Sequence, residues 1–230
     1  MAGILLSCMH MDEAFMDKLQ QLKIPCVLFD QTYEEYPGLK VGFDFYAGGY
    51  MATRYLIECG HRDIAFACGL MDRRSRKQRL EGYKAALREN GIRFNSKRLF
   101  LRGNDESGEN AEFRNGYQLG QMILDSDYLP DAVFAINDMM AMGIMQCLKD
   151  HGVYVPADVS VVGFDNIYLS EFVEPSLTTI RQPSHEMGCL AAHMLLDAIE
   201  QPELVQENVV MQPELVERKS VRKVYRKIRR

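Results

Sequence analysis

The sequence predicts an α/β protein built on mostly parallel β-sheets. Short apolar runs alternate with amphipathic helical patterns along almost all of its 230 residues. This alternation is typical of strand–helix–strand units, in which helices cover both faces of a parallel sheet. Hydrophobic residues make up 47% of the chain, which is enough to form the core of one or two domains.

The first part of the chain predicts three strands and two helices. The strands are expected at residues 4–6, 26–29 and 39–43, and the helices at 12–23 and 47–59. The earlier helix places Phe15, Leu19 and Leu22 on one apolar stripe. Gly60 is expected to end the later helix, because glycine adopts the left-handed conformation that closes many helices.

The same alternation continues from residue 64. Strands are expected at 64–67, 97–101, 132–135 and 160–163, helices at 75–90, 111–126, 138–152 and 184–200, and a final extended stretch at 208–215. Polar residues follow the strands at the points where they end, namely Asp44, residues 72–75, Asn137 and Asp165. Because ligands of parallel sheets bind beyond the carboxyl ends of the strands, these residues predict one shared binding site.

Charge, cysteines and hydropathy exclude several classes of protein. Residues 217–230 hold eight Lys or Arg and one acid, which leaves 19 basic and 31 acidic residues, a formal charge of −12, in the rest of the chain. This negative charge makes residues 1–216 a poor surface for binding nucleic acid. The six cysteines show no C-x-x-C spacing and are expected to be buried, unpaired thiols, with no metal site. No apolar run is long enough to span a bilayer and no signal peptide is evident, so we expect a cytoplasmic protein.

Six short segments resemble, in their order, the effector-binding domain of LacI/GalR transcription regulators. They are Val41–Asp44, Gly60–Arg62, Arg79–Tyr83, Asn137–Ala141, Ser160–Asn166 and Pro175–Gln182. The resemblance implies a periplasmic-binding-protein-like type I fold with two doubly wound parallel-sheet subdomains. Since residues 4–6 resemble an internal strand of that domain, the first subdomain is expected to be incomplete. A DNA-binding head is then expected to lie outside this chain.

The resemblance also implies how the chain is divided. Residues 1–61 and 181–203 would form the N-subdomain, residues 62–180 and 204–221 the C-subdomain, and residues 222–230 a basic tail. A small effector would bind between the subdomains, and the protein would act as a homodimer without a cofactor. The pair Gly48–Gly49 is expected to allow two helices to approach closely rather than to bind phosphate.

Arg79, Arg73 and Ser75 are the basic and hydroxyl candidates for the ligand site. In the family the arginine matching Arg79 contacts the effector, and its planar fork suits a sugar's vicinal hydroxyls or a carboxylate. The alternative is a surface arginine, because Arg79 stands in a basic run. Arg73 and Ser75 match positions that line the family's site, but Ser75 could instead cap the helix that follows.

Asp165 and Asn137 are the carboxylate and amide candidates. A carboxylate at a strand end can accept protons from two sugar hydroxyls, although Asp165 with Asn166 also makes a good turn pair. At the start of the helix 138–152, Asp138 is expected to be the N-cap, which would free Asn137 for the ligand.

These residues favour an effector-sensing domain over an enzyme. The chain has no G-x-G-x-x-G, no phosphate-binding G-x-x-x-x-G-K-[ST] and no G-x-S-x-G motif, and nothing resembles a nucleophile beside a base. A sugar or sugar derivative is the expected effector. Two alternatives stay open: a purine-responsive regulator, which residues 215–221 also resemble, and the solute-binding protein of a transporter.

Overall fold

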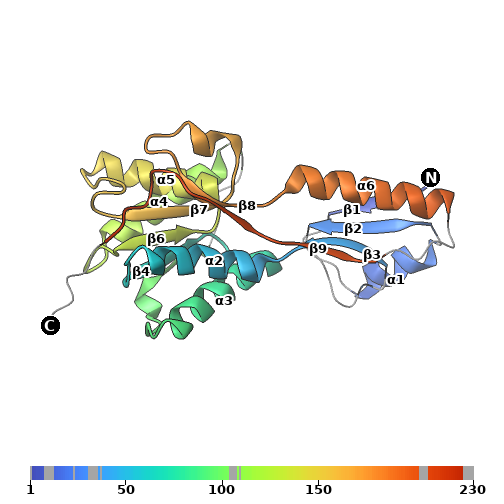
Figure 1. Ribbon diagram of the computed structural model, residues 1–230, viewed down its shortest axis with the longest axis horizontal. Coiled ribbons are helices and arrows are strands. Elements are labelled where there is room, and N and C mark those ends of the chain that lie inside the picture. Colours follow the sequence, from blue (N-terminus) through green and yellow to red (C-terminus); the bar gives the residue numbers. More distant parts are fainter. Residues whose placement is uncertain are drawn as a thin grey trace. The chain divides into compact units, whose positions relative to one another are not determined.

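The computed structural model describes residues 2–7, 13–22, 24–30, 36, 38–103, 108, 110–201 and 207–224. Contacts divide the chain into two compact units, each assembled from separate stretches of sequence. The first unit comprises Met1–Asp44 and Pro183–Pro213, and the second comprises Phe45–Gln182 and Glu214–Arg230. Figure 1 labels the elements of both units.

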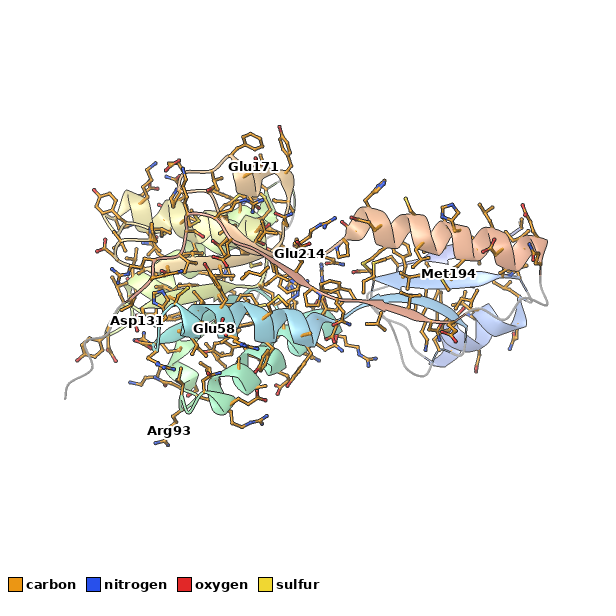
Figure 2. The ribbon with its side chains drawn as sticks, viewed as in Figure 1. Glu58, Arg93, Asp131, Glu171, Met194 and Glu214 are labelled. Carbon is orange, nitrogen blue, oxygen red and sulfur yellow. The ribbon has the colours of Figure 1, made fainter. Side chains whose placement is uncertain are left out.

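The first unit is a four-stranded parallel sheet with the strand order β1-β2-β3-β9. Its elements are β1 (Ile4–Leu6), α1 (Glu13–Gln21), β2 (Cys26–Asp30), β3 (Leu39–Phe43), α6 (Ser184–Glu200) and β9 (Val209–Met211). Helices α1 and α6 lie on opposite faces of the sheet (Figure 1). Met194 points from α6 toward the strands (Figure 2) and is buried. Leu19 of α1 forms a core cluster with Leu28 and Tyr36.

The second unit is built on a six-stranded sheet with the order β10-β8-β7-β6-β4-β5. Only β10 runs antiparallel to its neighbour. The strands are β4 (Ile64–Cys68), β5 (Leu99–Leu101), β6 (Ala132–Ala135), β7 (Ser160–Asp165), β8 (Thr178–Arg181) and β10 (Glu214–Val216). The helices are α2 (Phe45–Glu58), α3 (Arg74–Glu89), α4 (Ala111–Leu124) and α5 (Asp138–Asp150), with short 3-10 helices η1 (Ser96–Arg98) and η2 (Tyr168–Glu171). Helices α2 and α3 cover one face of this sheet, and α4 and α5 cover the other (Figure 1).

Glycines set the helix packing on both faces of the second unit. A Cβ atom at Gly49 would overlap the backbone of Arg79, and one at Gly82 would overlap the backbone of Tyr46 and Tyr50. Gly116 and Gly143 make the same kind of contact where α4 crosses α5. The expectation that Gly48–Gly49 serve close helix approach is therefore confirmed for Gly49, whose contact is with the helix that carries Arg79.

The α/β class and nearly all expected elements are confirmed, and the differences are local. Residues 97–98 belong to the 3-10 helix η1, and only Leu99–Leu101 pair with β4. The extended stretch expected at 208–215 is two strands, of which β9 pairs with β3 and β10 with β8. Strand β8 was not predicted, although it pairs with two neighbours.

Contacts group three segments differently from the division expected from the sequence, the shortest being residues 181–182, which fall in the second unit with β8. Residues 45–61 fall in the second unit, because α2 packs on α3, and residues 204–213 fall in the first, because β9 pairs with β3. Of the expected basic tail, Arg222 and Val224 are tied to the second unit: their amides donate to the Ser160 hydroxyl at 3.1 Å and the Cys59 carbonyl at 2.7 Å. Residues 225–230 lie outside the described residues.

The cysteines are mostly as expected, with one exception. Cys59, Cys68 and Cys147 are buried and form no disulfide, Cys26 is half-buried, and Cys8 lies outside the described residues. Cys189 is exposed, which corrects the expectation of burial, because it lies on the solvent side of the amphipathic helix α6. Within the described ranges no helix is long and apolar enough to cross a membrane, and no three His, Cys, Asp or Glu are grouped to hold a metal ion.

Candidate ligand-binding site

Arg79 is a buried arginine at the carboxyl edge of the six-stranded sheet. Its side chain is only 9% exposed, because α3 packs against the sheet along the stripe that holds Arg79, Gly82 and Tyr83. The guanidinium donates to the carbonyl of Ile136, just beyond the end of β6. Its flat face lies 3.7 Å from the ring centre of Phe164 and 5.0 Å from that of Phe45, which are cation–π distances. The alternative of a solvated surface arginine is therefore wrong.

Asp165 lies at the end of β7 and forms an ion pair with Arg79. The Asp165 Oδ1 atom is 3.6 Å from Arg79 Nη2, and the Asp165 side chain is 34% exposed. The backbone of Asp165 has φ of 106° and that of Asn166 has φ of 56°. This pair, which we call the left-handed turn, ends β7 without forming a regular hydrogen-bonded turn, so the alternative of an ordinary turn pair is not confirmed. The turn and the contact with Arg79 coexist, and together they present an accessible carboxylate beside a buried guanidinium.

Asn137, rather than Asp138, is the N-cap of α5. Its side-chain oxygen accepts from the amide of Met140 at 2.8 Å, and its amide nitrogen donates to Glu112 at 3.1 Å. The expectation that Asp138 would cap the helix is therefore wrong. The Asp138 side chain turns inward instead and is fully buried. Asn137 is next to Ile136, so it lies at the same edge as Arg79, but its side chain already has two structural partners.

Arg73 and Ser75 lie at the amino end of α3, after the carboxyl end of β4. Arg73 occupies the N-cap position without a side-chain cap, so the alternative that Ser75 caps the helix is wrong. Ser75 is 6% exposed and Arg73 is half-buried. Their neighbour Arg76 is held by the Leu70 carbonyl at 2.6 Å and by Glu112 at 3.2 Å. The structure thus joins Arg79 directly to Asp165, and Asn137 to Arg76 through Glu112.

Three residues of this edge were missed by sequence reasoning. Phe164 stands between a predicted strand and Asp165, where an aromatic residue normally indicates core packing. Glu112 comes from the first turn of α4, and no pattern links it to Asn137 or Arg76. Asp138 was assigned to a cap. Burial raises the pKa of the Asp138 carboxyl, and hydrogen bonds from Ser170 and Thr179 act in the opposite direction.

Chemically, this edge suits binding of a polar ligand. A guanidinium can only donate hydrogen bonds and a carboxylate can only accept them, so Arg79 and Asp165 offer both roles within one ion pair. Sugars match such a pair, because neighbouring hydroxyls can accept from one group and donate to the other.

Comparison with known proteins identifies the family. Residues 53–221 match the family model of the periplasmic binding protein-like domain. The solved structure of a LacI-family transcriptional regulator from Enterococcus faecium with bound ribose superposes with a TM-score of 0.86 at 30% identity, covering 97% of this chain and 81% of that one. The chain belongs to the LacI family of transcription regulators. The fold expected from the six short segments is thereby confirmed.

Curated relatives of this LacI-family chain include regulators of two kinds. The HTH-type transcriptional repressor PurR of Vibrio atlanticus is 36% identical over 221 residues, which cover 96% of this chain and 64% of the repressor. The ribose operon repressor of Escherichia coli is 35% identical over 219 residues, which cover 95% of this chain and 64% of that protein. The LacI-family chain thus spans a little under two thirds of the length of these relatives.

Proposed function

We propose that this chain is the effector-sensing domain of a DNA-binding transcription regulator, and that its effector is a sugar or sugar derivative. Arg79 and Asp165 make the principal contacts with the ligand, and Arg73, Ser75 and Asn137 lie around them. Binding biases the regulator between two conformations, to the extent that the ligand prefers one of them.

The ion pair between Arg79 and Asp165 is the observation that carries this proposal. Arg79 is held by the Ile136 carbonyl and the Phe164 ring, so it is already oriented before a ligand arrives. Asp165 keeps about a third of its side chain accessible. A site whose donors and acceptors are fixed in advance loses little conformational entropy on binding.

The aromatic rings at the pair favour a sugar over a purine. A purine is usually held by stacking on an exposed ring face. Phe164 is fully buried beneath the Arg79 guanidinium, and Phe45 is only 3% exposed. Neither of these two rings offers a free face to a base, whereas hydroxyl groups need only the polar edges of Arg79 and Asp165.

The relatives support both kinds of ligand. Structures of LacI-family regulators from two Enterococcus species contain ribose, and one curated relative is a ribose operon repressor. The 36% identity with a repressor named PurR keeps a purine-responsive regulator as the second candidate. These relatives are transcriptional regulators or repressors, which favours regulation over solute transport.

Homodimer formation is the second part of the proposed function. An apolar groove of about 770 Å³ lies between α5 and the segment after η2. Methionine and aliphatic side chains dominate its lining, among them Met139, Met142, Met145, Leu169 and Val173. Beside it, Tyr168 and Phe172 are 78% and 62% exposed, with ring centres 4.7 Å apart. Since monomers rarely expose contiguous apolar patches of this kind, a second copy of the chain is the proposed occupant.

The ligand proposal is tested by calorimetry of the 230-residue chain with ribose, other pentoses, hexoses and purine bases. Each of Arg79→Ala and Asp165→Ala leaves a ligand hydroxyl without its partner. Such a loss costs about 1–3 kcal/mol, which corresponds to binding roughly ten- to hundredfold weaker. Because the two residues share one ligand, the double variant should lose less than the sum of the two effects.

Matched controls are available at exposed positions of the same unit. Arg88→Ala removes an arginine near the end of α3, and Asp127→Ala removes an aspartate whose side chain is 75% exposed. Both should leave affinity unchanged. Tight binding of any sugar that survives Arg79→Ala and Asp165→Ala in a folded protein would show that the site is misplaced. Binding of a purine but no sugar would favour the second candidate.

The dimer proposal is tested by sedimentation equilibrium. Leu169→Glu and Phe172→Glu place a charge in or beside the groove and should shift the protein toward monomer. Tyr128→Glu changes a residue that is 77% exposed and lies outside the groove lining, so it should have no effect. A dimer of undiminished stability in both groove variants would contradict this assignment.

A further inference from the structure

The turn that presents Asp165 is conformationally strained. Asp165 and Asn166 are consecutive residues, neither of them glycine, and both have φ in the left-handed region, at 106° and 56°. Asp and Asn enter this region more readily than other non-glycine residues, but normally as single residues, so two in succession need contacts that hold them there. The position of the Asp165 carboxylate therefore depends on whatever fixes this turn.

The turn is anchored by the buried carboxylate of Asp138. Oδ2 of Asp138 accepts from the backbone amide of Ile167 at 2.9 Å and from the Ser170 hydroxyl at 2.6 Å, and Oδ1 accepts from the Thr179 hydroxyl at 2.5 Å. Two of these donors come from the segment directly after the turn, and the third comes from β8. Asp138 thus ties α5, η2 and β8 together at one point.

Two further hydrogen bonds hold Asn166 from the other side. Its amide donates to the Thr179 hydroxyl oxygen at 3.4 Å, and its side-chain oxygen accepts from Arg218 at 2.8 Å. Thr179 is thereby shared between Asp138 and the turn. Gly163 completes the arrangement, because a Cβ atom there would overlap Asp138 Oδ1. The missing side chain lets the carboxylate lie directly against β7.

We propose that Asp138 is the positioning residue of the ligand site: its carboxylate locks the left-handed turn at Asp165–Asn166 and so fixes the Asp165 carboxylate beside Arg79. The inference rests on the proposed function for the ligand, although the lock itself does not. The two oxygens of a carboxylate provide several acceptor sites, so one aspartate side chain can accept from all three donors at once.

The test substitutions remove different numbers of the hydrogen bonds made by Asp138. Asp138→Ala removes all three acceptor contacts, and Thr179→Val removes one hydroxyl while keeping the bulk of the side chain. Asp138→Asn is the conservative variant, since its oxygen can still accept from Ile167 and Ser170 while its amide faces the Thr179 hydroxyl. Ser220→Ala is the matched control. Ser220 is equally buried and makes two hydrogen bonds, to the Val161 carbonyl and the Thr178 amide, without contacting the turn.

Hydrogen exchange of the ligand-free chain tests the lock. In Asp138→Ala, the amides of Ile167 and Ser170 should exchange about tenfold faster or more, because local opening no longer breaks the contacts of Asp138. Thr179→Val should accelerate them less, and Ser220→Ala should not accelerate them at all. Unchanged exchange of this segment in folded Asp138→Ala, or equal acceleration in Ser220→Ala, overturns the proposal.

Calorimetry with ribose tests the consequence for binding. Asp138→Ala should weaken binding about as much as Asp165→Ala, roughly ten- to hundredfold, and should add almost nothing in the Asp165→Ala background. Asp138→Asn should retain affinity within about threefold. If Asp138→Ala weakened ribose binding as much in the Asp165→Ala variant as it does in wild type, Asp138 would not act through Asp165. If the wild-type chain does not bind ribose, the proposed sugar fails, and the exchange measurement still decides the lock. If Asp138→Ala does not fold, Ser170→Ala decides it by the same readouts, because it removes one Asp138 contact and leaves the Asn166 amide bonded to Thr179.

Discussion

Gly82→Ala should destabilise the protein and disturb Arg79, although alanine is the better helix former. A Cβ atom at Gly82 would overlap the carbonyl oxygen of Tyr46 and the amide nitrogen of Tyr50, which are backbone atoms that cannot rotate away. Helices α2 and α3 must therefore move apart. Since α3 carries Arg79 one turn earlier and α2 carries Phe45, the displacement reaches the ligand site.

The magnitude follows from two opposing effects. Overpacking a close contact costs about 1–3 kcal/mol. Replacing glycine by alanine inside a helix returns about 0.5–1 kcal/mol through backbone entropy. The midpoints of these two ranges leave a free energy of unfolding lower by about 1 kcal/mol, or a Tm lower by about 2–4 °C for a chain of this size.

Gly188→Ala is the matched control for the sign of this effect. Gly188 also lies within a helix, α6, but a Cβ atom there would meet nothing within 4 Å. Only the entropic gain remains, so this variant should be more stable by about 0.5–1 kcal/mol. Urea unfolding followed by circular dichroism measures both variants. The reasoning would be refuted if Gly82→Ala stabilised the protein as much as Gly188→Ala.

Three further predictions concern individual side chains. Arg79→Lys should unfold more easily than wild type by about 1–3 kcal/mol in urea titrations, because an ammonium cannot both stack flat on Phe164 and reach its carbonyl partner; equal stability would contradict this. In native protein at pH 8, Cys189 should react with a thiol reagent much faster than Cys147, because burial raises the pKa of the Cys147 thiol to about 11. Among the cysteines that the structure describes, Cys189 should account for the fast reaction, so Cys189→Ser should remove that contribution. Because burial raises the pKa of Asp138, the folded protein holds that proton more tightly than the unfolded chain. Its contribution to stability is therefore greatest below the ordinary aspartate pKa of 3.8 and is lost as pH rises through the folded-state pKa. Relative to wild type, Asp138→Asn should thus gain stability as the pH rises above about 4, and a difference in unfolding free energy that does not change with pH would disprove the linkage.

Much of the fold could be predicted because its signals are local. Most helices begin and end within two residues of the expected positions, since periodicity, Gly60 and Gly91 mark them within a few residues of sequence. Strand β8 was missed because Thr178 and Thr179 interrupt its apolar character. Both threonines are buried, and they are stabilised by hydrogen bonds to Ser220, Arg218 and Asp138. Those partners lie about forty residues away along the chain, where no local pattern reaches.

The same distinction explains which parts of the candidate site were predicted. The rule that ligands bind at the carboxyl ends of parallel strands located the edge, and it named Asp165 and Asn137 correctly as residues of that edge. It could not choose between Asn137 and Asp138 as the helix cap, because both residue types cap helices well. That choice is made by Ser170 and Thr179, 32 and 41 residues further along the chain, whose hydroxyls draw Asp138 inward.

Arg79 shows that some of the missing information was in the sequence after all. A basic run suggests a solvated helix face, and Arg73, Arg74, Arg76 and Lys77 surround this residue. Helical periodicity gives the opposite answer, because Arg79 shares the i, i+3, i+4, i+7 stripe with Gly82, Tyr83 and Ala86, which is the buried face of α3. A cation on the apolar stripe of a helix has to meet a carbonyl, a carboxylate or an aromatic ring inside the protein, and Arg79 meets all three. An arginine in register with a glycine and an aromatic residue is therefore a stronger indication of a buried arginine than its charged neighbours are of a solvated surface.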